Sequence, residues 1–273
     1  LRDYGVLLGF LALCIAISIA TPSFLGKQNI LNLLRQSSII GIISAGMTFV
    51  IISGNFDISV GAVAALAGAI TMKFATGGTN LFASMLLGVA ICAVIGLING
   101  IVVAKINVPS LIATMAMVTI VRGLLLMLTG GYPITENIPI LDYIGNGYLF
   151  SIPIPVVIFF IVVLASFIVL NKTKFGRYVY SVGGNQEASK LNGINVDSHK
   201  VKVFIINAVL AGIAGIVLTG RLGTATAIAG EGYDMDAIAS VVIGGTSVAG
   251  GSGSVLKTVI GVLLMSVINN SFN

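Results

Sequence analysis

Charged residues are rare in this chain. Only 8% of its 273 residues are Asp, Glu, Lys or Arg, whereas 57% are hydrophobic. Soluble domains carry about a quarter charged residues, so a chain this poor in charge would not stay dissolved. The composition therefore excludes an ordinary soluble protein and predicts an all-α, polytopic transmembrane helical bundle that lies in a lipid bilayer.

Histidine and cysteine are also scarce, which excludes several classes of enzyme. His199 is the only histidine, so no Ser/His/Asp catalytic set is indicated. Cys14 and Cys92 both lie in apolar runs and are interpreted as small core residues rather than a disulfide. Histidine, cysteine and acidic residues form no cluster with the spacing of metal ligands. The sequence therefore predicts a protein that is not an enzyme and that uses no catalytic residue, metal or cofactor.

A phosphate-binding loop is missing as well. Residues 251–258 (GSGSVLKT) resemble a Walker A motif, but Leu256 stands where that motif needs glycine. The chain is therefore not expected to bind ATP by this route. It would move a solute passively, by ion coupling, or with an ATPase that belongs to another subunit.

The net charge of +5 is concentrated in one polar interval, residues 171–202. Long apolar runs flank this interval and no aromatic-rich basic patch accompanies it, so the charge does not indicate nucleic-acid binding. Short loops rich in lysine and arginine stay on the cytoplasmic side of a membrane, which predicts that this loop is cytoplasmic. Six of the fourteen basic residues lie in it: Lys172, Lys174, Arg177, Lys190, Lys200 and Lys202.

A helix that crosses a bilayer needs about 20 apolar residues, within a range of about 17 to 25. Polar, proline-containing and glycine-rich breaks divide the single domain, residues 1–273, into about nine such stretches. A break at Thr21-Pro22-Ser23 and an amphipathic piece, Asn29–Gln36, are expected between the first two. The expected spans are Tyr4–Ala20, Ile39–Ile52, Val60–Ala75, Phe82–Ala104, Leu111–Leu128, Ile154–Leu170, Val203–Thr219, Met235–Val248 and Val255–Ile268.

Counting spans away from the cytoplasmic loop assigns a side to every other loop. Residues 129–150, one span earlier, fall outside and contain two acids and no base. The last span would end outside without a basic anchor, so a final span is expected to be absent and the chain to be truncated at its C-terminus. The other segments assigned to the outside are 21–37, 77–81 and 221–233. Those assigned to the inside are Arg2, 54–59, Lys105 and 249–254. Lys27, Arg35 and Arg221 are basic residues that fall outside, as exceptions to the rule.

Small residues recur at helical spacing inside the expected spans. Gly96 and Gly100 form a GxxxG motif, and Ala64–Gly68 and Ala211–Gly215 are similar pairs. Helices in lipid gain little from hydrophobicity when they associate, and small residues let their backbones approach closely. The pattern predicts a tightly packed bundle.

A few charged residues lie inside or beside the apolar spans. Asp57 is either functional at membrane depth or, like Ser59, an N-cap of the next helix. Arg122 lies about seven residues from the outer end of its span, roughly 10 Å deep. Its side chain either extends to the membrane surface, or turns inward to pair with an acid or to bind substrate hydroxyls. Asp234 and Asp236 present the same alternatives as Asp57.

Two aromatic–Asp pairs open small-residue spans. Phe56-Asp57 and Tyr233-Asp234 fall on opposite sides by the span count. An inverted repeat with two broken helices would give this arrangement, although two matched positions are little evidence by themselves.

The basic loop contains a short predicted helix. Asn185 is a suitable N-cap, Gln186–Leu191 are helix formers, and Gly193 can adopt the positive φ that ends a helix. The apolar side chains of Ala188 and Leu191, followed by Ile194, would dock into a groove of a partner, with Glu187 and Lys190 at the rim. The alternative is a solvated helix without a partner.

Three segments together resemble the ribose-type sugar permeases of bacterial ATP-binding cassette (ABC) importers, in the branched-chain amino acid/ribose permease superfamily. They are FGRYVYSVGGNQEASKLNGINV (175–196), GNFDISVGAVAALAGA (54–69) and AGEGYDMDAIASVVIGGTSVAGGSGSV (229–255). The segment 107–131 also matches in character. Family members continue beyond the position of Asn270 with another hydrophobic helix, which agrees with the expected truncation.

The resemblance implies a fold similar to the vitamin B12 importer permease, with about ten spans, in the bacterial inner membrane. It implies a permease dimer, homologous or identical, with two cytoplasmic ABC ATPase subunits and an extracytoplasmic sugar-binding protein. The short helix in 184–193 would be the coupling helix in a groove of the ATPase. Its expected residues are Gly184, Asn185, Glu187, Ala188, Leu191 and Gly193.

Two functional hypotheses follow. The first is the permease subunit of an ABC importer for ribose or a related monosaccharide. The second is an ion-coupled secondary transporter that uses Asp57, Arg122 and Asp234. The candidate residues of the translocation pathway are Asn55, Phe56, Asp57, Ser59, Arg122, Asp234 and Asp236.

Overall fold

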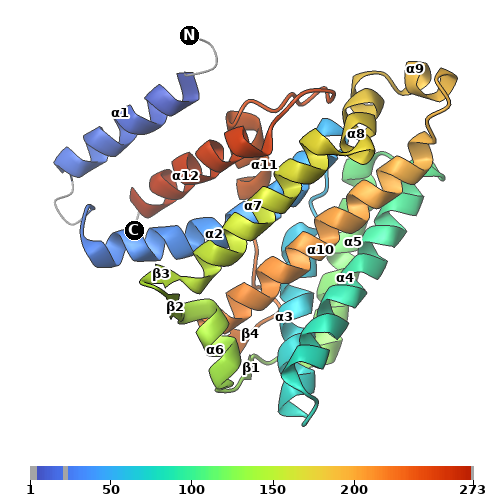
Figure 1. The fold of residues 1–273 in the computed structure, drawn as a ribbon. Helices are drawn as coiled ribbons and strands as arrows, with labels where there is room; N and C mark the ends of the chain where they lie inside the picture. Colours follow the sequence, from blue (N-terminus) through green and yellow to red (C-terminus); the bar gives the residue numbers. More distant parts are fainter. Residues whose placement is uncertain (1–4, 21–23, 272–273) are drawn as a thin grey trace.

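The computed structural model describes residues 5–20 and 24–271, which form a bundle of helices (Figure 1). The sequence-based assignments of Arg2 to the inside and of a break at Thr21-Pro22-Ser23 concern residues outside these ranges. Two antiparallel pairs of very short strands, β1–β4 and β2–β3, accompany the helices. The elements are α1 (Gly5–Ala20), α2 (Lys27–Ile52), α3 (Val60–Thr76), α4 (Leu81–Ala104), α5 (Ser110–Thr129), β1 (Ile134–Thr135), α6 (Pro139–Asn146), β2 (Tyr148–Leu149), β3 (Ile152–Pro153), α7 (Ile154–Lys172), α8 (Lys174–Gly184), α9 (Gln186–Leu191), α10 (Val196–Leu222), β4 (Thr224–Ala225), α11 (Tyr233–Ile243) and α12 (Val255–Ser271).

The centre of the bundle is formed by α2, α3 and α10 (Figure 1). Every residue in 37–52 of α2 and in 60–72 of α3 is buried. A helix that is apolar on all sides is expected to be buried on all sides, and these two segments meet that condition. The surrounding helices α4, α5 and α7 bury one face and expose large apolar side chains on the other.

The predicted small-residue contacts are confirmed, and all of them involve α10. A Cβ atom added to Gly96 of α4 would lie 2.7 Å from the Cβ atom of Ala208 on α10. A Cβ atom added to Gly68 of α3 would lie 3.0 Å from the carbonyl oxygen of Gly215. Glycine is therefore the residue that allows α3 and α4 to lie directly against α10.

The amphipathic piece Asn29–Gln36 and the second expected span are one continuous helix, α2, rather than two elements. Ser37 and Ser38 lie between the two predicted elements. Their hydroxyl groups donate to the carbonyl oxygens of Leu33 and Leu34 one turn earlier, at 2.7 and 2.6 Å. Because these polar groups are satisfied within the helix, they can be buried without interrupting it.

Among the described helices, five are long and apolar enough to cross a membrane: α2, α4, α5, α7 and α10. The segments Leu8–Ile19, Val60–Thr76 and Val255–Ser271 are apolar but shorter. The chain is therefore an all-α membrane protein. The expected span Met235–Val248 is wrong as a continuous helix, because α11 has 11 residues and is about 16 Å long against a hydrocarbon thickness of about 30 Å. It stops before Gly244 and Gly245, and Gly245 has φ +90°.

Two non-helical segments, 53–59 and 223–232, lead into α3 and α11 (Figure 1). The beginnings of these two helices meet, since Gly61 lies in backbone contact with Gly230. The aromatic–Asp pairs noted in the sequence stand at these two beginnings. The structure thus contains two broken elements that face each other.

Loops that the span count assigns to one side lie at the same end of the bundle. β1, in the segment 129–150, pairs with β4, in the segment 221–233. At the opposite end, the loop 249–254 contacts α8, and the hydroxyl of Tyr180 donates to the carbonyl oxygen of Gly253 at 3.0 Å. The ends with α6 and with α8 are called the outer and inner end below, following the charge distribution.

The basic interval 171–202 is mostly helical rather than a loop. It contains α8 and α9, and α10 begins at Val196 instead of Val203. Thr173 caps α8 by accepting from the backbone N–H of Gly176 at 3.1 Å, and Asn195 caps α10 by accepting from Ser198 at 2.9 Å. Side-chain caps of this kind satisfy the first N–H groups of a helix, so each helix has a defined start.

The glycine contacts predict a difference between two single substitutions. Gly96→Ala would place its Cβ atom 2.7 Å from that of Ala208, so α4 and α10 must move apart. Overpacking of this kind costs about 1–3 kcal/mol, and we expect a clearly lower melting temperature of the protein in detergent. Gly123→Ala is the control, because nothing lies within 4 Å of its added Cβ atom. Equal melting temperatures for the two variants would contradict the close contact.

Candidate functional site

A cavity of about 590 Å³ lies where the two broken elements meet α5. Ile58 and Gly61 line it at the beginning of α3, and residues 227–235 line it before and at the start of α11. Thr119 and Arg122 of α5 form part of its wall. Its volume is within the range of about 300–1,000 Å³ that is usual for small-molecule sites in proteins. We call it the central cavity and take it as the candidate solute site in the described part of the chain.

Arg122 turns inward, toward the segment before α11. Its Nη1 atom donates to the carbonyl oxygens of Ala227 and Ala229, the latter at 3.0 Å. Of the two readings of this arginine, the geometry supports the inward one. The expected partner is different, because backbone carbonyls rather than an acid accept its hydrogen bonds.

Asp57 lies outside the cavity, in a buried polar network. Its Oδ1 atom accepts from the backbone N–H and the hydroxyl of Ser59, at 2.9 and 2.6 Å. Its Oδ2 atom accepts from Nδ2 of Asn207 on α10 at 2.9 Å, and Asn99 on α4 donates to the Ser59 hydroxyl at 3.0 Å. The network joins the break before α3 to α4 and α10. Ser59 is the residue before α3. Neither its side chain nor that of Asp57 makes the N-cap hydrogen bond to α3 that the sequence suggested.

The other residues of this break also bond to nearby groups. The buried side chain of Asn55 donates to the carbonyl oxygen of Ser53 at 3.1 Å. The backbone N–H of Phe56 donates to the hydroxyl of Ser110, and that of Ile58 to the hydroxyl of Thr114, at 3.1 and 3.2 Å. Asn55 and Phe56 do not line the central cavity.

The two acids at the start of α11 point to different neighbours. Asp234 lines the central cavity, together with Glu231 from the preceding turn. Asp236 accepts a hydrogen bond from Asn269 of α12 at 3.4 Å and does not line the cavity. Of the seven candidate pathway residues, only Arg122 and Asp234 therefore lie in its wall.

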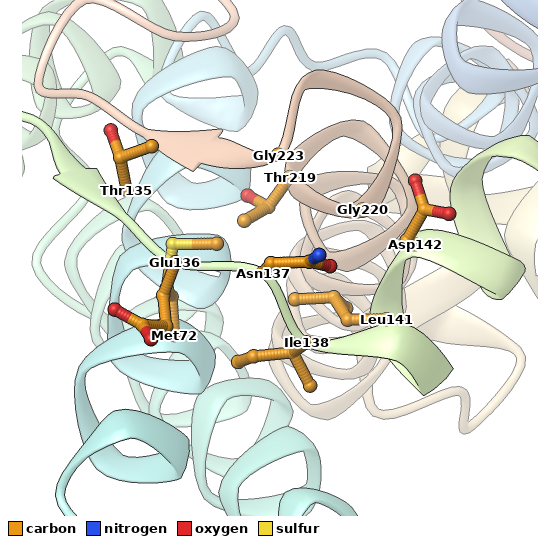
Figure 2. Close-up of a pocket in the computed structure, with 10 residues that line it drawn as sticks. All are labelled: Met72, Thr135, Glu136, Asn137, Ile138, Leu141, Asp142, Thr219, Gly220 and Gly223. Carbon is orange, nitrogen blue, oxygen red and sulfur yellow. The ribbon is translucent and has the colours of Figure 1, made fainter.

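A second, smaller pocket of about 170 Å³ opens at the outer end, between the β1–α6 segment and the end of α10. Figure 2 shows Glu136 and Asn137 on one side of it and Thr219 on the other. Asp142 also lines it and no lining residue is basic, so this pocket is acidic.

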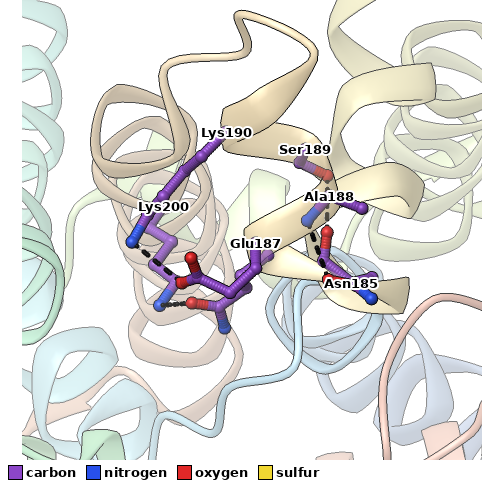
Figure 3. A network of polar contacts seen from close by, with 7 residues as sticks. Asn185, Glu187, Ala188, Ser189, Lys190 and Lys200 are labelled. Carbon is purple, nitrogen blue, oxygen red and sulfur yellow. Dashed lines mark hydrogen bonds and ion pairs between the residues drawn. The ribbon is translucent and has the colours of Figure 1, made fainter.

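The predicted short helix is present at the inner end as α9 (Figure 3). Asn185 is its N-cap and accepts from the backbone N–H of Ala188 at 2.9 Å, and Gly193 after its end has φ +78°. Glu187 and Lys190 form an exposed ion pair at 3.2 Å. Leu191 is 89% exposed. Gly184, expected in this helix, is instead the last residue of α8.

The base of α9 is attached to the bundle. Lys200 of α10 donates to the side-chain oxygen of Gln186 at 2.9 Å (Figure 3). The ring of His199 stacks on Phe175 of α8 with centroids 5.8 Å apart, and meets the ring of Tyr178 edge-on at 5.1 Å. His199 therefore packs α10 against two aromatic rings of α8.

Glycines place α8 directly against the end of α2 and against the loop that follows α11. A Cβ atom added to Gly183 would overlap the carbonyl oxygen of Ile52, at the end of α2, and would lie 2.8 Å from the backbone nitrogen of Gly251. That nitrogen donates to the carbonyl oxygen of Ile52 at 2.8 Å. The chain continues from Ile52 into the break before α3, and α11 leads into the loop that holds Gly251. We call these three residues, Gly183, Gly251 and Ile52, the glycine joint.

Several of these residues were not identified from the sequence. Asn99 and Asn207 are polar residues in the middle of apolar spans, which is a sequence signal of function or pairing. Glu231 lies in the segment 221–233, which the span count assigns to the outside without identifying a role for it. Gly183 carries no sequence signal beyond its residue type, because its role depends on segments that are distant in the chain.

Comparison with known proteins gives a consistent result. Residues 29–273 match the family described as branched-chain amino acid transport system/permease component. The ribose import permease protein RbsC of Haemophilus influenzae is 42% identical, over 97% of this chain and 84% of its own length, and RbsC of Bacillus subtilis is 42% identical, over 100% and 85%. The D-allose transport system permease protein AlsC of Escherichia coli is 37% identical, over 96% and 82%. No solved structure matches the chain.

The Asp57 network predicts the effect of removing one donor. Asn207→Leu would leave Oδ2 of the buried Asp57 without its hydrogen bond. An unsatisfied buried polar group costs about 1–3 kcal/mol, and a charged one costs more, so we expect a marked fall in melting temperature. The matched control is Asn171→Leu, since Asn171 is exposed and its amide bonds only within its own helix. An unchanged melting temperature for Asn207→Leu would contradict the network.

Proposed function

Because the chain belongs to the family of branched-chain amino acid transport system permease components, we propose that it is the permease subunit of an ABC importer for ribose or a related monosaccharide. The observation that carries this proposal is the 42% identity to ribose import permeases over nearly the whole chain. The family consists of transport components rather than enzymes, and the chain is one of them. Relatives named for D-allose and xylose belong to the same set, so the proposed substrate class is a small neutral sugar.

We further propose that α9 is the surface that binds the ATPase. A leucine that is 89% exposed in a capped helix at the end of a membrane bundle is unfavourable in water, because its apolar surface stays hydrated. Ala188 lies beside it and an exposed ion pair flanks it, which is the pattern of an apolar contact with a polar rim. A permease without a phosphate-binding loop needs an ATPase from another subunit.

The glycine joint supplies a route from α9 to the cavity. α9 follows α8 directly, and α8 lies in backbone contact with the end of α2 and with the loop after α11. Both of these lead into the broken elements that line the central cavity. Movement imposed on α9 would therefore reach both sides of the cavity through backbone contacts.

In this proposal the central cavity is part of the translocation pathway. Its mouth carries exposed apolar side chains of Met115, Ile228 and Met235, and a second permease copy in the dimer would cover them. The outer end, with its acidic pocket, would face the sugar-binding protein. Nine crossings result if α1, α3 and α12 cross and if segment 223–232 crosses together with α11. Such an arrangement, in the bacterial inner membrane, would be similar to the vitamin B12 importer permease.

The ion-coupled alternative lacks a specific observation in its favour. It needs Asp57, Arg122 and Asp234 to act as one network, but Asp57 bonds to Ser59 and Asn207, whereas Arg122 bonds to backbone carbonyls. Uptake driven by a proton or sodium gradient, without ATP and partner subunits, would favour it.

The ATPase contact predicts the effect of a charge at the tip of α9. Leu191→Asp should abolish co-purification of the ATPase subunits encoded with this permease and reduce sugar uptake at least about tenfold, because a buried, unpaired carboxylate costs several kcal/mol. The melting temperature of the permease alone should stay unchanged, since Leu191 contacts solvent. Leu149→Asp, at an exposed leucine of the outer end, should leave ATPase binding intact. Normal ATPase binding and uptake in a Leu191→Asp, Glu187→Ala double variant would refute the proposal.

The glycine joint predicts uncoupling by a single methyl group. Gly183→Ala forces α8 away from Ile52 and Gly251, so we expect bound ATPase subunits that hydrolyse ATP while sugar uptake falls. Gly184→Ala is the matched control at the next position, because its Cβ atom would meet only the Cα atom of Gly251, at an ordinary 3.9 Å. The ratio of sugar transported to ATP hydrolysed, measured in proteoliposomes, tests this. An equal ratio in both variants would show that the joint does not transmit movement.

A further inference from the structure

We propose that the central cavity binds the sugar directly, through a hydroxyl-binding subsite formed by Arg122, Glu231 and Asp234. This inference rests on the proposed function, in which the cavity is part of the sugar pathway. It adds a defined ligand site and a charge preference to that pathway.

Arg122 has hydrogen-bonding capacity to spare. A guanidinium group has five N–H donors, and only Nη1 is used within the described residues, toward Ala227 and Ala229. Those two bonds fix the position of the group in the cavity wall. Nε and Nη2 are not among the buried polar atoms that lack a partner. These two groups are therefore accessible and can donate to a ligand.

Two carboxylates in the same wall are also unused. Within the described ranges, Glu231 and Asp234 accept no hydrogen bond from another side chain, and the one ion pair there joins Lys190 to Glu187. Asp57, in contrast, has hydrogen bonds on both carboxylate oxygens. Glu231 and Asp234 thus differ from Asp57, because their carboxylate oxygens remain available to accept hydrogen bonds from a ligand.

The three groups match the chemistry of a neutral polyol. Each hydroxyl of a sugar can donate to a carboxylate and accept from a guanidinium, so adjacent hydroxyls can use both kinds of group together. The apolar side chains of Val118 and Met235 in the same lining can contact the C–H faces of the ring.

The charges of this subsite also exclude a class of ligand. One guanidinium and two carboxylates sum to −1, which disfavours an anion such as a sugar phosphate by like-charge repulsion. Binding must also be weak enough for release, as in any pathway that a solute has to leave. We therefore expect a low-affinity site that prefers neutral sugars to phosphorylated ones.

A cysteine introduced into the cavity wall reports on occupancy. Thr119 lines the cavity, so Thr119→Cys places a thiol there, and Cys14→Ala removes the more exposed native thiol while the buried Cys92 remains. The complete importer with this permease, in proteoliposomes, is labelled with a membrane-impermeant thiol reagent, with and without D-ribose. At a sugar concentration of about three times Kd the site is about three-quarters occupied, so labelling should slow about fourfold. D-ribose 5-phosphate at the same concentration should protect much less.

The subsite is then tested with isosteric variants. Glu231→Gln and Asp234→Asn, combined, should raise the D-ribose concentration needed for half-maximal protection and should weaken the discrimination against D-ribose 5-phosphate. Asp236→Asn is the matched control, because Asp236 lies on the same turn of α11 but bonds to Asn269 outside the cavity. It should leave protection unchanged.

The outcomes separate the subsite from the proposed function. If the parent importer takes up D-ribose but the sugar does not protect the introduced thiol, or protects it equally in the protein with both acids substituted, the subsite is refuted and the function stands. If the parent importer takes up no monosaccharide in an ATP-dependent manner, the proposed function itself fails.

Discussion

Close backbone contact at glycine is the interaction on which this bundle depends. Lipid tails are as apolar as the helices, so association in a membrane relies on packing that small residues permit. Gly96 and Gly68 place α4 and α3 against α10, Gly61 brings the two broken elements together, and Gly183 fastens α8 to the end of α2. The same kind of contact therefore sets the core, the cavity and the inner end.

The two breaks raise a second constraint, because backbone groups that leave a helix inside a membrane protein need hydrogen-bond partners within the protein. Here α5 supplies partners for both breaks. Ser110 and Thr114 accept from the N–H groups of Phe56 and Ile58 in the first break. Arg122, two to three turns further along the same helix, donates to carbonyl oxygens in the second. An arginine that looked exceptional in an apolar span is thus explained by the chain segment opposite it.

Features determined by local sequence were predicted well. The N-cap at Asn185 and the stop at Gly193 depend on neighbouring residues, and both were confirmed. The spacing of Gly96 and Gly100 predicted a packed face because the helical period links sequence to surface. Features that depend on distant segments were not predicted. Asn207 meets Asp57 across 150 positions, and no pattern around either residue indicates the other.

Errors in the predicted boundaries have a common physical origin. Hydropathy placed a gap before Ile39 and a span over Met235–Val248, since it reports composition and not hydrogen bonding. Serine hydroxyls that bond back to the preceding turn kept α2 continuous, and a glycine pair with one positive φ ended α11 early. Because α11 is short, the segment before it reaches the cavity as non-helical chain, mostly as turns, and that segment carries the carbonyl groups that hold Arg122. The glycine joint contacts the loop that follows α11. In the proposed function, a displacement at the inner end would pass through α11 to the carbonyl groups that accept from Arg122. Coupling and solute binding would then share one short helix.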